Sequence, residues 1–389
     1  MKKYFADRID GLVQNDIRRM SLECTRLGGI NLGQGICDQP VESIIKQAAI
    51  RAIEEDQSIY TRLDGLDELR RRIAAKMRAH NGIDCNPEGE VVVSVGSTGA
   101  FVTACLAFVD PGDEVVLFSP FYGYHLNILK VCGAAVRFVT LRPPDWSFDE
   151  QELARAVTPR TKMILVNTPS NPSGKVFSRD ELTLIADLCR RHDALCVTDE
   201  IYEYILYDGR RHVSIGSLPG MEDRTITISG FSKTYAMTGW RLGYAVARRP
   251  LAEKMALLND LLSICAPSPL QHGVVAAFDL PPSYYETMRA EYQTKRDRTA
   301  EACRDAGMEP FVPQGSYYML ADVRGLGFRD DQEAARLLLE RCGVAVIPGS
   351  SFYADPADGR TQVRLCYAKT MPDLQDACRR LRTLKPIHA

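Results

Sequence analysis

Between residues 91 and 247 the chain repeats one pattern, a short apolar run followed by a loop and usually by a helical segment. Seven runs are candidate strands: Val91–Val95, Glu114–Phe118, Ala135–Thr140, Met163–Val166, Ala194–Thr198, Thr225–Ile228 and Gly243–Ala247. Most are nearly continuous in apolar residues, as in strands of a parallel sheet that is covered on both faces. With helices such as Ala100–Val109 and Arg179–His192 between them, the pattern predicts an α/β domain whose ligands bind outside the carboxyl ends of the strands.

The segments outside this repeat predict a second, smaller domain. A polar helix, Tyr284–Ala306, precedes three strand-like segments and two helical ones: Gly315–Asp322, Val344–Ile347, Thr361–Ala368, Gln332–Arg341 and Met371–Leu384. Residues 4–30 are expected to form a helical arm, and 42–56 an amphipathic helix. Because 389 residues exceed the usual size of one core, we expect an arm over residues 1–44, a large domain over 45–282 and a small α+β domain over 283–389.

The composition excludes several classes of partner. A net charge of −2 with no basic patch gives no reason to expect nucleic acid or an anionic membrane. No run of 18 apolar residues and no signal-peptide h-region is present. The twelve cysteines are scattered without zinc or Cys-x-x-Cys spacing, so we expect no metal site, and most of them, such as Cys105, Cys132 and Cys196, are expected to be small core residues. The expected location is the cytoplasm.

The stretch Ser229–Tyr244 carries the strongest chemical signal. Lys233 follows the strand Thr225–Ile228 directly, and Arg241 lies eight residues further on. A lysine amine buried at such a place has a lowered pKa and becomes a nucleophile toward carbonyl groups, as a Schiff-base lysine requires. An arginine pairs well with phosphate oxygens. An aldehyde partner and a phosphate partner together suggest pyridoxal 5'-phosphate, although a bare Lys and Arg pair is more often an ordinary feature of a domain interface.

Other strand ends carry residues that suit the same cofactor. Gly96–Ala100 opens a helix, so the backbone N–H groups near Ser97 and Thr98 could hold a phosphate, as a nucleotide-binding turn also would. Tyr122 could stack on a flat ring or simply pack in the core. Asp199 could hold a proton on a pyridine nitrogen or cap a helix.

Two further side chains complete this set. Asn171 lies in the turn-rich loop 167–174, and Tyr202 follows Asp199 by three residues. Both side chains can donate a hydrogen bond to a phenolate oxygen.

The order of these segments resembles the class I and II aminotransferases of pyridoxal-phosphate fold type I, from about residue 30 to the end of the chain. The resemblance implies that Lys233 holds the cofactor as an imine, then moves the proton between substrate and cofactor while an amino group passes from an L-amino acid to a 2-oxo acid. It implies that Ser97, Thr98 and Arg241 hold the phosphate. Where many relatives carry a phosphate-binding serine this chain has Gly230, so Ser232 or Ser229 is the expected substitute.

The same resemblance assigns three residues outside the large sheet. Gly35, in the extended segment 30–36, matches a glycine whose backbone meets the substrate. Arg364 matches the arginine that grips the substrate α-carboxylate, whereas its apolar neighbours alone would also fit a water-facing arginine on an edge strand. Tyr60 matches a tyrosine that reaches the cofactor phosphate of the other subunit, which implies a homodimer with shared active sites.

Several alternatives remain open at this point. The same fold supports carbon–sulfur β-lyases, eliminations like those of cyclopropane-carboxylate synthases, and amino-acid oxidases. A non-catalytic regulator or a plain nucleotide-binding protein fits less well, since the first has an added DNA-binding domain and the second leaves Lys233, Arg241 and Asp199 unexplained. The segment Leu32–Gly35 resembles the kynurenine, glutamine and methionine aminotransferases, but Ile36-Cys37 replaces their usual Phe-Pro. No second arginine for a dicarboxylate substrate stands out.

Overall fold

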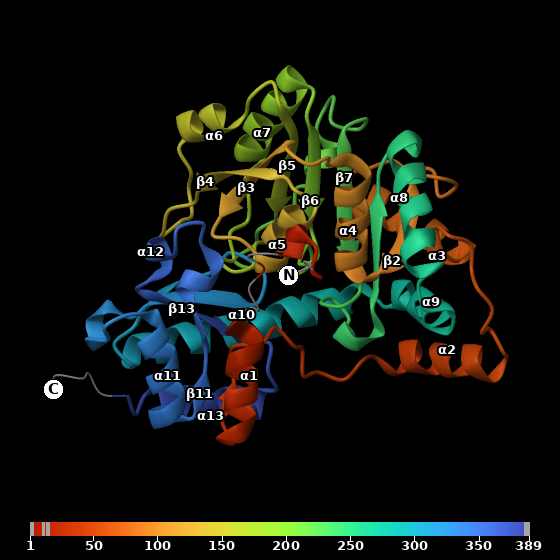
Figure 1. Cartoon of the computed structure of the whole chain (residues 1–389). Helices are drawn as coiled ribbons and strands as arrows, with labels where there is room; N and C mark the ends of the chain where they lie inside the picture. Colours follow the sequence, from red (N-terminus) through yellow and green to blue (C-terminus); the bar gives the residue numbers. More distant parts are fainter. Residues whose placement is uncertain (1–3, 10–11, 13–15, 385–389) are drawn as a thin grey trace.

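The computed structural model describes residues 4–9, 12 and 16–384 and has a seven-stranded sheet at its centre (Figure 1). Its strands are β2 (Val91–Val95), β3 (Glu114–Ser119), β4 (Ala135–Thr140), β5 (Thr161–Asn167), β6 (Leu195–Asp199), β7 (Thr225–Gly230) and β8 (Leu242–Val246). The spatial order is β2-β8-β7-β6-β5-β3-β4. Only β8 runs antiparallel to its neighbours, so the prediction of a mainly parallel sheet is confirmed.

Both faces of this sheet are buried, which explains the continuous apolar runs. In β3, Val115 and Leu117 pack on one side and Val116 and Phe118 on the other, following the two-residue period of a strand. The first side is covered by α4 (Gly96–Phe108), α5 (Gly123–Val131) and α8 (Arg249–Ser263). The second is covered by α6 (Glu150–Ala156) and α7 (Arg179–His192). The connections place the loops that follow β2, β5 and β6 at one end of the sheet.

The edge near β2 carries a further layer of helices. These are α2 (Ser43–Glu54), α3 (Asp67–Lys76), a π-helical turn η2 (Met77–Asn81) and α9 (Ser268–Val275). Short 3₁₀ turns lie at Asp7–Ile9, Ile215–Ser217, Thr238–Trp240, Ala276–Asp279, Arg324–Leu326 and Gly349–Phe352. No helix in the described ranges is both long and apolar enough to cross a membrane.

The C-terminal part forms a second sheet, which is antiparallel. Its strands are β9 (Glu309–Phe311), β10 (Tyr318–Asp322), β12 (Ile347–Pro348) and β13 (Gln362–Cys366), in the order β12-β13-β10-β9. The helices of this part are α10 (Pro282–Asp305), α11 (Asp331–Cys342), α12 (Pro356–Gly359) and α13 (Met371–Leu381). The predicted segment Val344–Ile347 divides into two short strands, β11 (Val344–Ala345) and β12.

The N-terminal segment packs against this second sheet. Instead of one helix over residues 4–30, the structure has α1 (Asp16–Arg26) followed by β1 (Ile30–Asn31), and the predicted apolar position Val13 lies outside the described residues. Strand β1 pairs in parallel with β11. Helix α1 ends before residue 30 because Gly28 has a left-handed φ of 63°, which turns the chain toward β1.

Candidate active site

A cavity of about 780 Å³ opens at the carboxyl ends of β5 and β6, beside the turn after β7 and the start of α4. It brings together nearly every residue predicted from the sequence: Gly35, Ser97, Thr98, Tyr122, Asn171, Asp199, Tyr202, Ser232, Lys233, Arg241 and Arg364. Tyr60 is not among its lining residues and is 73% exposed. The cavity therefore gathers the predicted groups of one chain, and Tyr60 points elsewhere.

The Lys233 amine lies inside this cavity without a carboxylate partner. Its Nζ donates to the Gly35 carbonyl at 3.4 Å and lies 5.8 Å and 5.6 Å from the ring centres of Tyr202 and Tyr317. Removal of the amine from water lowers the pKa of Lys233, and the Arg241 guanidinium acts in the same direction. Among the described residues no ion pair involves Lys233, so the amine is available for chemistry.

Asp199 ends β6 and faces a histidine that the sequence prediction did not single out. Its Oδ2 lies 3.1 Å from Nε2 of His125, a buried residue of α5, while Oδ1 accepts from the Ile201 amide at 3.2 Å. The second contact closes a local turn, and the alternative role of Asp199 as a helix cap is wrong because the described residues directly after β6 begin no helix. His125 follows Tyr122 by three residues, but this spacing does not predict a contact with Asp199, which lies 74 residues further along the chain.

The start of α4 and Arg241 form a concave, cationic corner. Gly96 has a left-handed φ of 71°, and a Cβ there would lie 2.6 Å from Nη2 of Arg241. Arg241 itself has a φ of 57° and donates from Nη1 to the Thr238 carbonyl at 3.1 Å. Only glycine at position 96 leaves room for the guanidinium to close over the first turn of α4, where Ser97 and Thr98 line the cavity.

The structure explains the glycine at position 230. A Cβ on Gly230 would lie 2.9 Å from the Gly243 Cα and 3.1 Å from the Leu242 carbonyl oxygen, so a serine does not fit without displacing β8. Ser229 is fully buried and donates to Oε1 of Glu203 at 2.6 Å, outside the cavity lining. Ser232 lines the cavity. Of the two candidate serines, only Ser232 is in position to meet a ligand.

Arg364 is fully buried in β13, an interior strand of the second sheet, so a water-facing arginine on an edge strand is excluded. Its Nη1 donates to Oδ1 of Asn171 at 2.8 Å and its Nη2 to the Gly33 carbonyl at 2.6 Å. The guanidinium carbon lies 4.3 Å from the ring centre of Tyr318 and 4.6 Å from that of Phe352. Nε has no hydrogen-bond partner in the described structure, which leaves donor capacity for an anion.

Tyr318, at the start of β10, lines the cavity, and Tyr317 directly before it lies outside the lining; sequence patterns did not distinguish either from ordinary strand residues. Tyr317 donates to the Gly35 carbonyl at 3.2 Å, and Tyr202 donates to the Tyr318 hydroxyl at 3.4 Å. A Cβ on Gly35 would lie 1.7 Å from the Tyr318 hydroxyl oxygen. Glycine at position 35 is therefore required for the N-terminal segment to pass this close.

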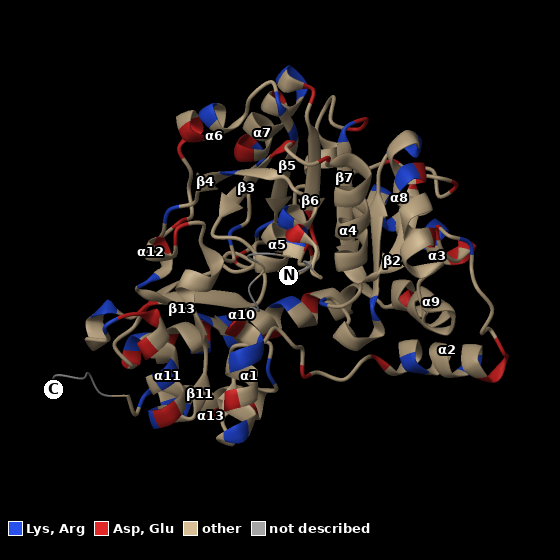
Figure 2. Ribbon diagram, viewed as in Figure 1, with Lys and Arg blue, Asp and Glu red and all other residues tan. Residues whose placement is uncertain are grey.

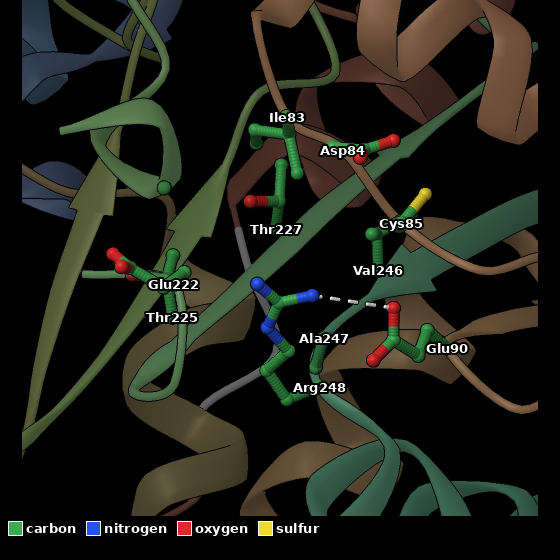
Figure 3. A pocket seen from close by; sticks show the side chains of 11 residues that line it. Ile83, Asp84, Cys85, Glu90, Glu222, Thr225, Thr227, Val246, Ala247 and Arg248 are labelled. Atoms are coloured by element: carbon green, nitrogen blue, oxygen red, sulfur yellow. Dashed lines mark ion pairs between the residues drawn. The ribbon is translucent and has the colours of Figure 1, made fainter. Parts of the chain in front are cut away.

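The remaining hollows are less suited to a ligand. The pocket in Figure 3 lies at the amino end of β7 and holds only about 20 Å³, room for about one water molecule. There Arg248 pairs with Glu90 at 3.6 Å. Asp84 and Cys85 of this pocket also border an open surface depression of about 450 Å³.

A buried polar cluster lies behind the cavity wall. Glu200, Glu203 and His212 bring potential metal-ligand atoms within 4.8 Å of one another. However, Lys76 donates from Nζ to Glu203 at 2.5 Å, and His212 Nε2 lies 2.7 Å from Glu200. The lysine ammonium thus already supplies a cation to this cluster.

The comparisons with known proteins agree with this geometry. The chain matches the family described as aminotransferase class I and II over residues 28–381. It is 38% identical over 376 residues to the probable N-succinyldiaminopimelate aminotransferase DapC of Mycobacterium tuberculosis, covering 94% of each chain. It is 32% identical over 417 residues to human kynurenine–oxoglutarate transaminase 1, covering 99% of each.

Solved structures give the same result. The N-succinyldiaminopimelate aminotransferase of Mycobacterium tuberculosis superposes with a TM-score of 0.94 at 36% identity, covering 97% of this chain and 99% of that one. The Escherichia coli protein YbdL, described as having a methionine aminotransferase function, has a TM-score of 0.94 at 30% identity, covering 98% of this chain and all of that one. The chain belongs to the class I and II aminotransferases of fold type I. It is a pyridoxal-phosphate-dependent enzyme that transfers amino groups between amino acids and 2-oxo acids.

The cavity residues fit pyridoxal phosphate. The corner at Gly96, which a Cβ would fill, lies at the positive end of the α4 dipole beside Arg241 and suits a phosphate. Lys233 offers an unpaired amine of lowered pKa, and Asp199 offers the cavity's one carboxylate. Each reactive part of the cofactor thus has a complementary group in this chain.

The buried cluster predicts a loss of stability in acid. Burial lowers the pKa of His80, a neighbour of Glu203, to about 4. Since the histidine pKa is about 6.5 in the unfolded chain, stability falls as the pH drops from 6.5 toward 4. Despite its burial, Lys76 and the nearby histidines hold the pKa of Glu203 at about 2, so its contribution is lost only below about pH 4.5.

We expect His80→Phe, which preserves stacking on Tyr204, to lose less stability than the wild type when the pH falls from 7.5 to 5. The loss in free energy of unfolding should be smaller by up to about 2 kcal/mol, because the variant has no imidazole to protonate. The measurement is urea unfolding at both pH values. His192→Gln, at the end of α7, is the control and should follow the wild type. An unchanged pH dependence in His80→Phe would contradict the assignment.

Proposed function

We propose that Lys233 is the catalytic lysine of this aminotransferase, that Arg364 binds the substrate α-carboxylate, and that a second copy of the chain completes each site. The observation that carries the proposal is the arrangement of Lys233, Arg241 and Arg364 around one cavity that contains a single carboxylate, Asp199. These three cations exceed the one carboxylate in charge, which suits a phosphate and a substrate carboxylate.

The Lys233 amine has two tasks in this proposal. Its lowered pKa makes the neutral amine available to bond to the cofactor aldehyde. As a free amine, Nζ would take the proton from the substrate Cα and return it on the cofactor side. The cofactor, when bound, supplies an electron sink for the charge that develops at Cα.

Side chains around the ring position would hold its polar atoms. Asp199 would keep a proton on the pyridine nitrogen, and His125, 3.1 Å from its Oδ2, fixes the carboxylate. Because Oδ1 of Asn171 already accepts from Arg364, its amide nitrogen is the end free to donate to the phenolate oxygen, together with the Tyr202 hydroxyl. Tyr122 would stack on the ring.

The phosphate would lie in the corner formed by Ser97, Thr98, Ser232 and Arg241, at the positive end of the α4 dipole. Arg364 lines the cavity, its guanidinium carbon lies 4.3 Å and 4.6 Å from the ring centres of Tyr318 and Phe352, and its Nε is a donor without a partner among the described residues. A planar guanidinium fixed in this way can bind a carboxylate through two parallel hydrogen bonds.

An exposed apolar surface beside the site supports the dimer. It consists of Ile44, Ile50, Ile53, Ile59, Tyr60, Leu257, Leu261, Leu262 and Ile264. Asn259 of α8 donates to the Leu63 carbonyl at 2.8 Å, Ser268 at the start of α9 donates to the Gln57 carbonyl at 3.1 Å, and α2 packs against α9, so these segments adjoin one another. An apolar surface of this kind needs a cover, and a second copy would bring Tyr60 of the partner subunit to the phosphate.

We also propose a cytoplasmic location and a division into parts at residues 44/45 and 282/283. All twelve cysteines are free, which suits a reducing compartment.

The first experiment replaces the catalytic lysine. Lys233→Ala should lose the visible absorption of the lysine-linked cofactor and at least roughly 1000-fold in kcat. Turnover is measured as glutamate formed from 2-oxoglutarate, with released ammonia assayed in parallel to detect elimination. Lys162→Ala, at an exposed position of β5, is the matched control. Near-normal transamination by Lys233→Ala would refute the proposal.

The second experiment tests the carboxylate site. Arg364→Lys should bind the cofactor normally and lose roughly 30- to 1000-fold in kcat/KM for amino acids, because a point charge cannot replace the bidentate fork. A simple amine that lacks a carboxylate should be affected far less. Arg360→Lys, exposed and just before β13, serves as the control. Unchanged kcat/KM in Arg364→Lys would place the carboxylate site elsewhere.

The third experiment asks whether Tyr60 acts across the dimer. Inactive Lys233→Ala chains are mixed with Tyr60→Ala chains under conditions that exchange subunits. If Tyr60 serves the partner's site, one site of each heterodimer has an intact Lys233 and an intact partner tyrosine, so activity should rise above that of either parent. Activity no higher than the average of the two parents would show that Tyr60 acts within its own chain or not at all.

A further inference from the structure

Helix α1 forms one wall of the active-site cavity, which its sequence did not indicate. Arg18, Ser21, Leu22 and Thr25 line the cavity at the spacing of one helical face. The opposite face places Met20 and Cys24 in the core with the second sheet. A segment expected to be only an arm therefore presents an arginine to the substrate cavity.

This wall is anchored, so Arg18 has a defined location. Asp16 accepts from Arg19 at 2.7 Å and from Ser351 Oγ at 2.5 Å, which ties the start of α1 to the second domain. Asn31 donates to Ser21 Oγ at 3.0 Å, and Ser21 lies 3.2 Å from Oε1 of Gln34. These bonds fix the helix over the cavity.

Arg18 differs from the other arginines of its helix. Arg19 pairs with Asp16 at 2.7 Å and Arg26 with Glu23 at 2.8 Å, each within one helical turn. No ion pair or side-chain hydrogen bond involves Arg18 in the part of the chain that the structure describes. Its charge is left without a protein counterpart although carboxylates are available on the same helix.

The balance of charges in the cavity also leaves Arg18 without a counterpart. Four cationic side chains line it, Arg18, Lys233, Arg241 and Arg364, against the one carboxylate of Asp199. The proposed function uses Lys233 for the cofactor aldehyde, Arg241 for its phosphate and Arg364 for the substrate α-carboxylate. Arg18 is the remaining cation, and polar groups of Ser21, Gln34 and Asn127 line the cavity with it.

We propose that Arg18 is a specificity-determining residue, which binds the carboxylate at the far end of an acidic substrate while Arg364 holds its α-carboxylate. The inference rests on the proposed function, because it needs Arg364 as the first anchor. A guanidinium matches a second carboxylate in charge and shape. Arg18 therefore raises the affinity of the enzyme for dicarboxylic amino and 2-oxo acids above its affinity for substrates whose side chain is neutral.

The binding test uses two unreactive five-carbon acids on the cofactor-loaded enzyme. Glutarate has carboxylates at both ends, whereas pentanoate has one and a methyl group. By calorimetry, wild-type enzyme should bind glutarate about 10-fold more tightly than pentanoate, given partial exposure of Arg18 to water. Arg18→Gln should remove this difference and leave pentanoate binding within about two-fold. Arg26→Gln, on the same helix but outside the cavity, should keep it.

The kinetic test repeats the comparison with substrates. Arg18→Gln should lower kcat/KM for 2-oxoglutarate about 10-fold and leave that for 2-oxopentanoate unchanged, and Arg18→Lys should recover part of the loss. Equal losses for both oxo acids, or glutarate discrimination that survives in Arg18→Gln, would overturn the inference.

Arg364→Lys separates this inference from the function on which it rests. If the proposed function holds, that variant weakens glutarate and pentanoate alike. If it weakens neither, the α-carboxylate assignment is wrong and the inference falls with it. If it weakens both while Arg18→Gln changes neither, only the inference fails.

Discussion

An unpaired lysine amine in a cavity away from bulk water is the constraint on which the rest of this structure depends. A charged amine at such a place is costly unless a carboxylate accompanies it, and no carboxylate pairs with Lys233 among the described residues. The lowered pKa is the consequence, and it makes the amine reactive toward a carbonyl group. The fold stabilises this arrangement elsewhere, through a large sheet that is buried on both faces and a second sheet whose Tyr318 and Arg364 line the cavity.

Close approach of backbone segments from distant parts of the chain builds the cavity, and glycines permit it. Gly35 lets the N-terminal segment pass under Tyr318, Gly96 admits the Arg241 guanidinium, and Gly243 lies against the backbone of Ser97, where a Cβ would come within 2.3 Å of its amide nitrogen. Each contact joins segments that are far apart in sequence. The cavity is therefore a product of tertiary structure, and replacing any of these glycines by alanine would push a wall outward.

The sequence predicted the large sheet and most of the cavity because those signals are local. Apolar runs mark strands, and turn residues directly after them mark strand ends, which is where Asp199 and Lys233 lie. Three features could not be predicted this way. His125 becomes important only through its 3.1 Å contact with Asp199, Tyr317 and Tyr318 only through Gly35, and Arg18 only because α1 packs over the cavity. Such contacts depend on the packing of separate elements, which periodicity does not encode.

Two lysines near β7, Lys76 and Lys233, show how the fold neutralises one buried lysine and leaves the other without a counterion. Lys76 reaches into the cluster behind β7, where Glu203 pairs with its ammonium group at 2.5 Å and also accepts a hydrogen bond from Ser229 at 2.6 Å. Lys233, four residues after Ser229, turns into the cavity and meets only a carbonyl oxygen and aromatic rings. Glu203 lies outside the cavity lining and Asp199 is the one carboxylate within it, so the charge of Lys76 is neutralised and the amine of Lys233 is not. The same partition explains Ser229 and Ser232: the first satisfies Glu203, and only the second is left for a ligand.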